Sequence, residues 1–87
     1  MVKVITELEK TILLSALILT RGNTKKLFKE DEIVLKFPMR QRKTVRRFVK
    51  KLVKEGYLVE SSGKNYRLSE EGLKIATRLL HEGGTFV

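Results

Sequence analysis

The stretch that decides the fold is TVRRFVKKLVKEGYLVESSGKNYRLSEEGL, residues 44–73. Apolar residues three and four apart in its first third are typical of one face of a helix, and Gly56 follows as a C-cap. Two short runs rich in β-branched and aromatic residues, YLVES and NYRLS, flank the turn SGK and predict a hairpin. Ser69 then precedes two glutamates, which is typical of the start of a helix. The stretch predicts a helix, a β-hairpin and a second helix, in that order.

The residues before this stretch supply the remaining elements. The first predicted helix of the stretch extends back to Pro38, which suits a first helical turn, so we expect it over residues 38–55. The capping box TELE predicts a helix over residues 7–19 that Gly22 ends. TKKLF, residues 24–28, is expected to be a brief strand, and the acids of KEDE favour a short helix over residues 30–36. We therefore predict one α+β domain over residues 1–82, followed by a flexible tail at residues 83–87.

Nearly all of the net charge lies in residues 40–54, RQRKTVRRFVKKLVK, which hold eight basic residues and no acid. The whole chain has 19 Lys and Arg against 10 Asp and Glu; without this segment the counts are 11 and 10. At about 100° per residue, the helix has an apolar face and a cationic face. The apolar face consists of Val45, Phe48, Val49, Leu52 and Val53. Like charges four residues apart repel, and no acid within the segment relieves them, so the sequence favours a polyanionic partner over a merely solvated face.

Composition narrows the class of protein. A chain of 87 residues, 41% hydrophobic and 33% charged, is a single globular domain and not a disordered chain. It has no run of eighteen apolar residues and no signal-peptide pattern at its N-terminus, so we expect a cytoplasmic protein. Lys and Glu make up 21 residues against one Gln and two Asn, a bias that suits a hyperthermophile.

No residue pattern indicates catalysis. Without cysteine there is no disulfide, thiolate zinc site or thiol nucleophile, and His81 is the one imidazole. His81 comes near the end of a predicted helix, where a cation is favourable without further role. The chain has no phosphate-cradling glycine loop and no metal-binding motif. We expect a protein that is not an enzyme and needs no cofactor or metal.

The order of elements and the segment at residues 44–73 resemble the winged helix-turn-helix family. The shared features are the basic amphipathic helix, the L-x-x-x-G-Y-L exit, the hairpin with a central Gly-Lys, and the Y-R-L-S-E-E-G entry to the last helix. The chain looks most like small regulators of the MarR, PadR or ArsR type, and like small winged-helix proteins of thermophilic archaea and their viruses. The resemblance implies a transcriptional regulator that binds double-stranded DNA, with the basic helix in the major groove and the hairpin, or wing, on the backbone.

The resemblance also implies which residues meet DNA. The candidate base readers lie between the N-terminal end and the middle of the basic helix: Arg40, Gln41, Lys43, Thr44 and Arg47. Gln41 falls towards the apolar side, so it reaches a base only if the helix end is exposed. Lys50, Lys51 and Lys54 lie farther along the helix and are candidates for phosphate contact, while Lys64 and Arg67 on the hairpin are candidates for contact with phosphate or a minor groove. Arg42 and Arg46, at the border of the basic face, complete the expected DNA-binding residues. For Lys64, simple turn chemistry is an equal alternative.

Two other kinds of function remain open from sequence. The fold can serve protein–protein contact inside a larger assembly, with the basic face on an acidic partner. It can also serve an architectural or RNA-binding protein with little sequence preference. Tyr57 and Tyr66 could stack on bases, but in strands of so small a protein we expect them in the core.

The first predicted helix is apolar nearly all round, and the last is apolar over a wide arc. One small core does not easily cover both, so we expect a homodimer through these two helices. The residues assigned to its interface are Leu13, Leu14, Leu17, Ile75 and Leu79. The alternative is that the core of the monomer covers them.

Overall fold

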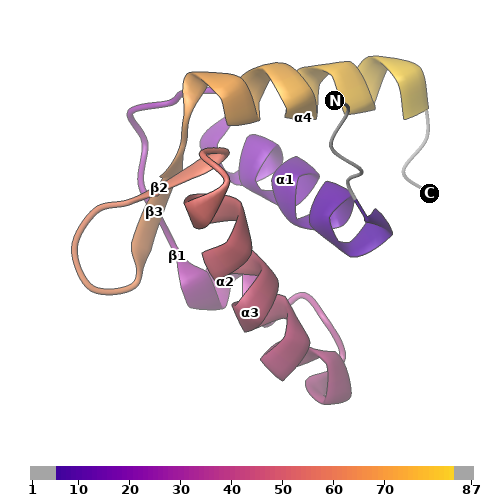
Figure 1. The fold of residues 1–87 in the computed structure, drawn as a ribbon, viewed down its shortest axis with the longest axis vertical. Helices are drawn as coiled ribbons and strands as arrows, with labels where there is room; N and C mark the ends of the chain where they lie inside the picture. Colours follow the sequence, from indigo (N-terminus) through magenta and orange to yellow (C-terminus); the bar gives the residue numbers. More distant parts are fainter. Residues whose placement is uncertain (1–5, 84–87) are drawn as a thin grey trace.

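Four helices and one small antiparallel sheet make up the fold, which is mostly helical (Figure 1). The computed structural model describes residues 6–83. In chain order the elements are α1 (Glu7–Thr20), β1 (Phe28–Lys29), α2 (Glu30–Val34), α3 (Met39–Lys54), β2 (Leu58–Glu60), β3 (Asn65–Leu68) and α4 (Glu70–Gly83). The predicted α+β class and the predicted order of elements are confirmed.

Local capping interactions set three helix ends as the sequence predicted, while α2 and α3 begin without a side-chain cap. The Thr6 hydroxyl accepts a hydrogen bond from the Glu9 N–H at 3.2 Å, and the Glu9 carboxylate accepts one from the Thr6 N–H at 3.1 Å. Gly56 follows α3 with φ 89°, a left-handed conformation that costs glycine little. Ser69 caps α4, because its hydroxyl accepts the Gly72 N–H at 2.9 Å.

The structure corrects several boundaries. The left-handed C-cap of α1 is Arg21, with φ 54°, and Gly22 comes one residue later. The strand β1 starts only at Phe28, because the Asn23 side chain organises a turn over the preceding residues and accepts the Lys25 N–H at 2.9 Å. The helix α4 continues to Gly83, and the rest of the predicted tail, residues 84–87, lies outside the described residues.

The sheet has the order β1-β3-β2, with both pairings antiparallel. Phe28 of β1 is opposite Tyr66 of β3, and Leu58 of β2 is opposite Leu68. The Tyr66 ring is buried and lies 6.2 Å from the Phe28 ring, while Tyr57 is half-buried and packs against the core. The expectation that both tyrosines serve the core is therefore confirmed.

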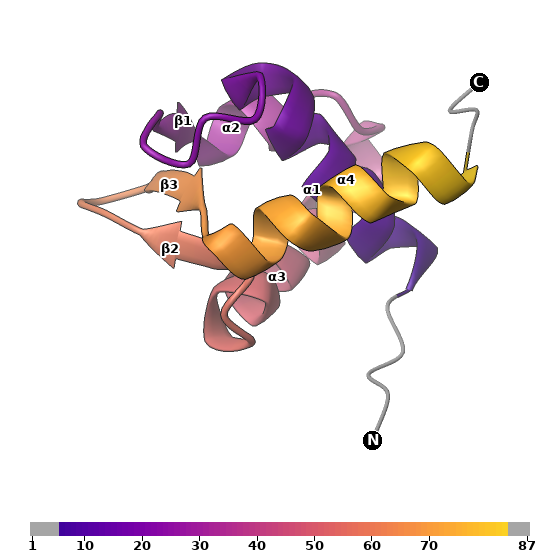
Figure 2. The same cartoon turned by 90° about the horizontal axis from the view of Figure 1, so that it is seen from above.

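The core lies where α1, α3 and the sheet meet. Both views of the fold place α4 alongside α1, while α3 crosses beneath them and ends near the hairpin (Figures 1 and 2). Buried residues come from every element: Ile12, Leu13, Ala16, Phe28, Ile33, Val34, Val45, Val49, Leu52, Leu58, Tyr66, Leu68 and Ala76. Gly72 lets α4 approach the chain after α3, because a Cβ placed there would lie 1.9 Å from the Tyr57 carbonyl oxygen. Among residues 6–83, no helix is both long and apolar enough to cross a membrane.

Candidate nucleic-acid interface

The two faces of α3 are divided as the sequence predicted. Val45, Val49 and Leu52 are fully buried, and Phe48 and Val53 pack against the core. The cations on the opposite side are exposed: Arg40, Lys43, Arg47, Lys50, Lys51 and Lys54. Gln41 is exposed as well, so the N-terminal end of α3 is open to a partner, and Thr44 is half-buried.

Arg46 does not belong to the exposed cationic side. Its guanidinium donates to the carboxylates of Glu30 and Asp31, with the Asp31 contact at 3.1 Å. Glu30 is only 2% exposed. Its hydrogen bond to Arg46, followed by that of Asp31, raises the pKa of the guanidinium above its ordinary value. Arg46 therefore ties α3 to the start of α2 instead of presenting its charge to a partner.

Glu30 extends this link to the sheet. The Tyr66 hydroxyl donates to the second Glu30 oxygen at 3.2 Å, and the Glu30 N–H donates to the Lys64 carbonyl at 2.9 Å. Burial, followed by the negative charge of Glu30, raises the pKa of Tyr66 to about 12. Through these contacts Glu30 holds α2, α3 and the hairpin in one relative orientation. The sequence had explained this carboxylate only as a charge at a helix start.

Two further cations of the basic segment have partners within the fold. The Arg42 side chain donates to the Phe37 carbonyl at 3.1 Å and so holds the connection between α2 and α3. The Lys51 ammonium lies 3.7 Å from the buried Glu9 carboxylate of α1 and 5.6 Å from the centre of the Phe48 ring. The segment itself holds no acid, as its sequence shows, but acids from α1 and α2 neutralise part of its charge.

Five cations on the outer side of α3 have no ion-pair partner in the described part of the chain. No acidic side chain within residues 6–81 forms an ion pair with them. We call these residues the free cationic face: Arg40, Lys43, Arg47, Lys50 and Lys54. Three of them, with Phe48 and Lys51, line a shallow hollow on the C-terminal half of the helix.

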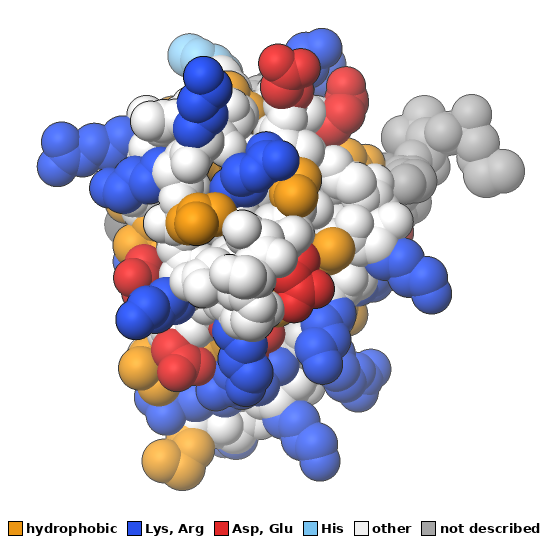
Figure 3. Space-filling view, turned by 90° about the vertical axis from the view of Figure 1, so that its left-hand side faces the viewer, with side chains coloured by type: hydrophobic (Ala, Val, Ile, Leu, Met, Phe, Trp, Pro, Cys, Tyr) orange, Lys and Arg blue, Asp and Glu red, His pale blue; other side chains and the backbone are white. Residues whose placement is uncertain are grey.

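The hairpin adds a smaller group of cations. Lys64 is exposed at the turn, and Arg67 is half-buried on β3 opposite Val59. Lys29 of β1 is opposite Asn65 and lines the same small hollow as Lys64, a neighbour that the sequence analysis missed. A sequence-based prediction that β1 pairs with β3 would have placed Lys29 beside the hairpin turn. Seen from the hairpin side, Lys and Arg side chains dominate the lower part of the molecule, where α3 lies (Figure 3).

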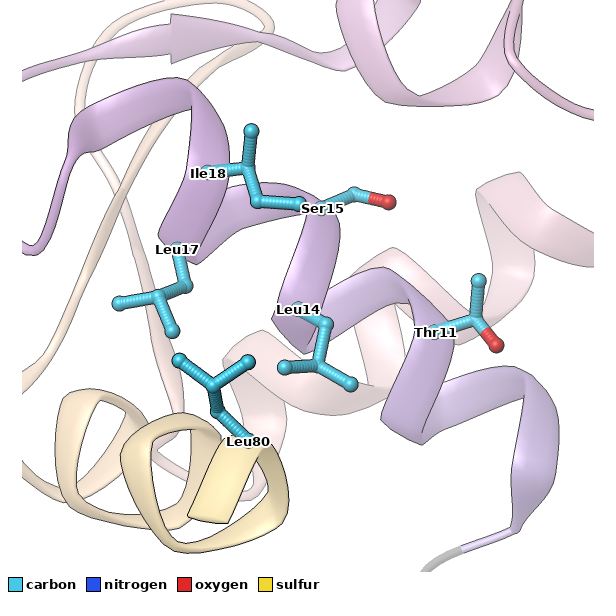
Figure 4. Close-up of a pocket in the computed structure, with 6 residues that line it drawn as sticks. All are labelled: Thr11, Leu14, Ser15, Leu17, Ile18 and Leu80. Atoms are coloured by element: carbon cyan, nitrogen blue, oxygen red, sulfur yellow. The ribbon is translucent and has the colours of Figure 1, made fainter. Parts of the chain in front are cut away.

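An apolar groove lies on the other side of the molecule, between α1 and α4. Leu80 of α4 points toward Leu14 and Leu17 of α1 (Figure 4). The side chains of Ile18 and Leu80 are 68% and 50% exposed. The groove lining consists of Thr11, Leu14, Ser15, Leu17, Ile18 and Leu80.

The burial of the residues in α1 and α4 revises the predicted dimer interface. Leu13 is fully buried and Leu14 is 4% exposed, because the core of the monomer covers them, so they offer almost no surface. Leu17, Ile75 and Leu79 are half-buried. The most exposed large apolar residues of α1 and α4 are instead Ile18 and Leu80.

Within residues 6–83, no three His, Cys, Asp or Glu side chains are grouped so that they could hold a metal ion. His81 is exposed on the last turn of α4, away from the free cationic face.

No protein-family model, curated protein or solved structure matches this chain.

Proposed function

We propose that this protein is a winged-helix transcriptional regulator that binds double-stranded DNA. In this proposal α3 lies in the major groove and the β2–β3 hairpin is the wing that contacts the backbone. The observation that carries it is the free cationic face: five unpaired cations on one side of one helix, while Arg46 and Lys51 on the same helix are paired internally. The acids whose ion pairs with α3 are seen in the described part of the chain, Glu9, Glu30 and Asp31, pair with Lys51 and Arg46 and not with this face.

A polyanion is the partner that this arrangement suits best. Lys43 and Arg47 are four residues apart, as are Lys50 and Lys54. The two like charges of each pair therefore repel each other in the free protein. DNA carries about one charge per 1.7 Å of axis, and each phosphate that a cation neutralises releases counterions. The repulsion along the helix therefore becomes attraction on binding.

The proposal divides the work along α3. Arg40 and Lys43 belong to its N-terminal half, where Gln41 is also exposed, and Arg47 lies at its middle; these residues would reach base edges. Lys50 and Lys54 would contact phosphate, together with Lys64 and Arg67 of the hairpin. Arg42 and Arg46 are not included among the DNA contacts, because their donors already serve the Phe37 carbonyl and the α2 carboxylates.

The proposal includes a homodimer formed through the α1–α4 groove. Packing Ile18 and Leu80 of one copy into the groove of a second would remove both exposed side chains from water. A two-fold pair could present its two α3 helices to successive major grooves about 34 Å apart.

The test is a binding titration with mixed genomic duplexes, a single-stranded DNA, an RNA hairpin and polyglutamate, each at several salt concentrations. A regulator of this kind binds duplex DNA most tightly, and some duplexes are enriched over others. Equal affinity for all duplexes would indicate an architectural protein, and preference for RNA would indicate an RNA-binding protein. Binding to polyglutamate but not to duplex DNA would favour an acidic protein partner.

A further inference from the structure

Met39 is exposed in an unexpected place. It is the first residue of α3, and 79% of its surface is open to solvent, the largest fraction among the large exposed hydrophobic residues in the described part of the chain. The core cluster does not include it. An apolar side chain of this size is thus left in water at the tip of the most basic helix.

Helix geometry places Met39 on the cationic side of α3. Lys43 is four residues on, and side chains four apart are neighbours on one helix face. Lys50 is three turns on, and it falls about 20° from Met39 around the axis. Val45 and Leu52 of the apolar face fall about 120° and 140° from Met39 around the axis. Met39 is therefore an apolar end to the free cationic face and not an extension of the core.

The surrounding charge restricts what can cover Met39. A second copy of this chain docked here would bring two sets of unpaired cations together, which is unfavourable. An apolar pocket on a neutral protein would leave Arg40 and Lys43 beside it without anionic partners. The occupant needs negative charge along the helix and a small apolar group at its tip.

The major groove of DNA has this combination. Phosphates line its edges, and the thymine C5-methyl is the apolar group that it presents among the base edges. We propose that Met39 packs on a thymine methyl and makes the protein prefer thymine at the position that it faces. This inference rests on the proposed major-groove binding of α3 and adds to it the base that the tip of the helix selects.

Replacement of thymine by deoxyuridine tests this contact, because it removes the methyl and leaves the hydrogen-bonding edge of the base unchanged. A preferred duplex is first selected from a random pool with the wild-type protein. Dissociation constants are then measured for that duplex and for the same duplex with every thymine replaced by deoxyuridine. The proteins are the wild type, Met39→Ala, Met39→Leu and Leu27→Ala, the last as a control that truncates an exposed hydrophobic residue just before β1.

The wild type should bind the uracil duplex about fourfold more weakly for each methyl contacted, which corresponds to about 0.8 kcal/mol per buried CH₂-sized group. Met39→Ala should bring this ratio close to one, Met39→Leu should keep most of it, and Leu27→Ala should leave it unchanged. Since each ratio compares two duplexes with one protein, a general loss of affinity does not affect it.

Three results would overturn the inference while leaving the proposed function in place. One is a wild-type ratio near one in a protein that still binds duplex DNA in a salt-dependent way. Another is an unchanged ratio in Met39→Ala, which would mean that Met39 faces another part of the DNA, as a minor-groove wedge would. The third is a loss of self-association in Met39→Ala by sedimentation, which would make Met39 a contact between copies. No binding to duplex DNA at all would refute the proposed function and this inference with it.

Discussion

The partners of Glu30 lead to a sharp prediction about stability. Glu30→Ala removes a carboxylate that is 2% exposed and that receives hydrogen bonds from Arg46 and Tyr66. Asp31→Ala removes the other carboxylate on the same guanidinium, but Asp31 has a side chain that is 62% exposed. The two variants therefore compare a buried and an exposed partner of one cation.

The expected costs follow from burial. A hydrogen bond to a charged group contributes about 1.5–3 kcal/mol, and a buried hydroxyl left without an acceptor costs about 1–3 kcal/mol. The lost hydrogen bond from Arg46 and the unpaired Tyr66 hydroxyl involve the same carboxylate, so their costs do not simply add. We therefore expect Glu30→Ala to lower the free energy of unfolding by about 2–4 kcal/mol. An exposed ion pair contributes about 0–1 kcal/mol, so Asp31→Ala should cost no more than about 1 kcal/mol.

Urea unfolding of the two variants and the wild type, followed by far-ultraviolet circular dichroism, measures both costs. The dependence of the unfolding free energy on urea should be the same in all three, which shows that the compared states are the same. Equal costs for the two variants, or a cost below about 1 kcal/mol for Glu30→Ala, would refute the claim that Glu30 joins α2, α3 and the sheet.

Three other predictions concern the fold and its association. Gly72→Ala should lower the free energy of unfolding by about 3 kcal/mol in the same urea assay, since the new methyl would lie 1.9 Å from the Tyr57 carbonyl; a change under about 1 kcal/mol would contradict the close approach. Because the folded protein raises the pKa of Tyr66 to about 12, the stability that its neutral phenol supplies is present below pH about 10 and is lost as the pH rises toward 12. The free energy of unfolding of Tyr66→Phe, measured by urea titration, should fall less steeply over this pH range than that of the wild type. Identical pH profiles would show that Tyr66 does not cause the loss of stability. Ile18→Lys should shift the protein from dimer to monomer by sedimentation velocity; a wild type that is already monomeric at tens of micromolar, with and without DNA, would refute the dimer.

Much of the fold was predictable because its signals are local. Thr6 and Glu9 are three residues apart, and Ser69 directly precedes the helix that it caps, so neighbours in sequence decide these helix ends. The spacing of Val45, Val49 and Leu52 likewise identified the buried face of α3. The brief strand was placed too early, because propensity alone did not reveal the turn that Asn23 forms.

The division of cations within α3 could not be predicted in the same way. Arg46 meets Glu30 across sixteen residues, and Lys51 meets Glu9 from another helix. A helical wheel places Arg46 at the border of the basic face but does not show which helix packs against that border. The sequence therefore predicted which side of α3 is exposed, but it overestimated the unpaired charge on that side. Acids of α1 and α2 pair with Lys51 and Arg46, and only the structure shows these contacts. The burial of Leu13 is similar, since the all-round apolar pattern of α1 does not show how much of it the core can cover.

The central claim is that the free cationic face of α3 binds DNA, and the salt dependence of binding tests it most directly. The logarithm of the association constant should fall linearly with the logarithm of salt concentration, with a slope of about −0.9 for each phosphate contacted. Lys54→Gln should make the slope less steep by about one on a preferred and on a scrambled duplex alike, while Arg47→Ala should cost about 1–3 kcal/mol on the preferred duplex and relax its preference. Lys74→Gln, which alters an exposed lysine on α4 paired with Glu71, is the matched control and should leave the slope unchanged. Slopes and affinities that are the same in Lys54→Gln, Arg47→Ala and the wild type, in variants whose thermal melts show them folded, would contradict the account.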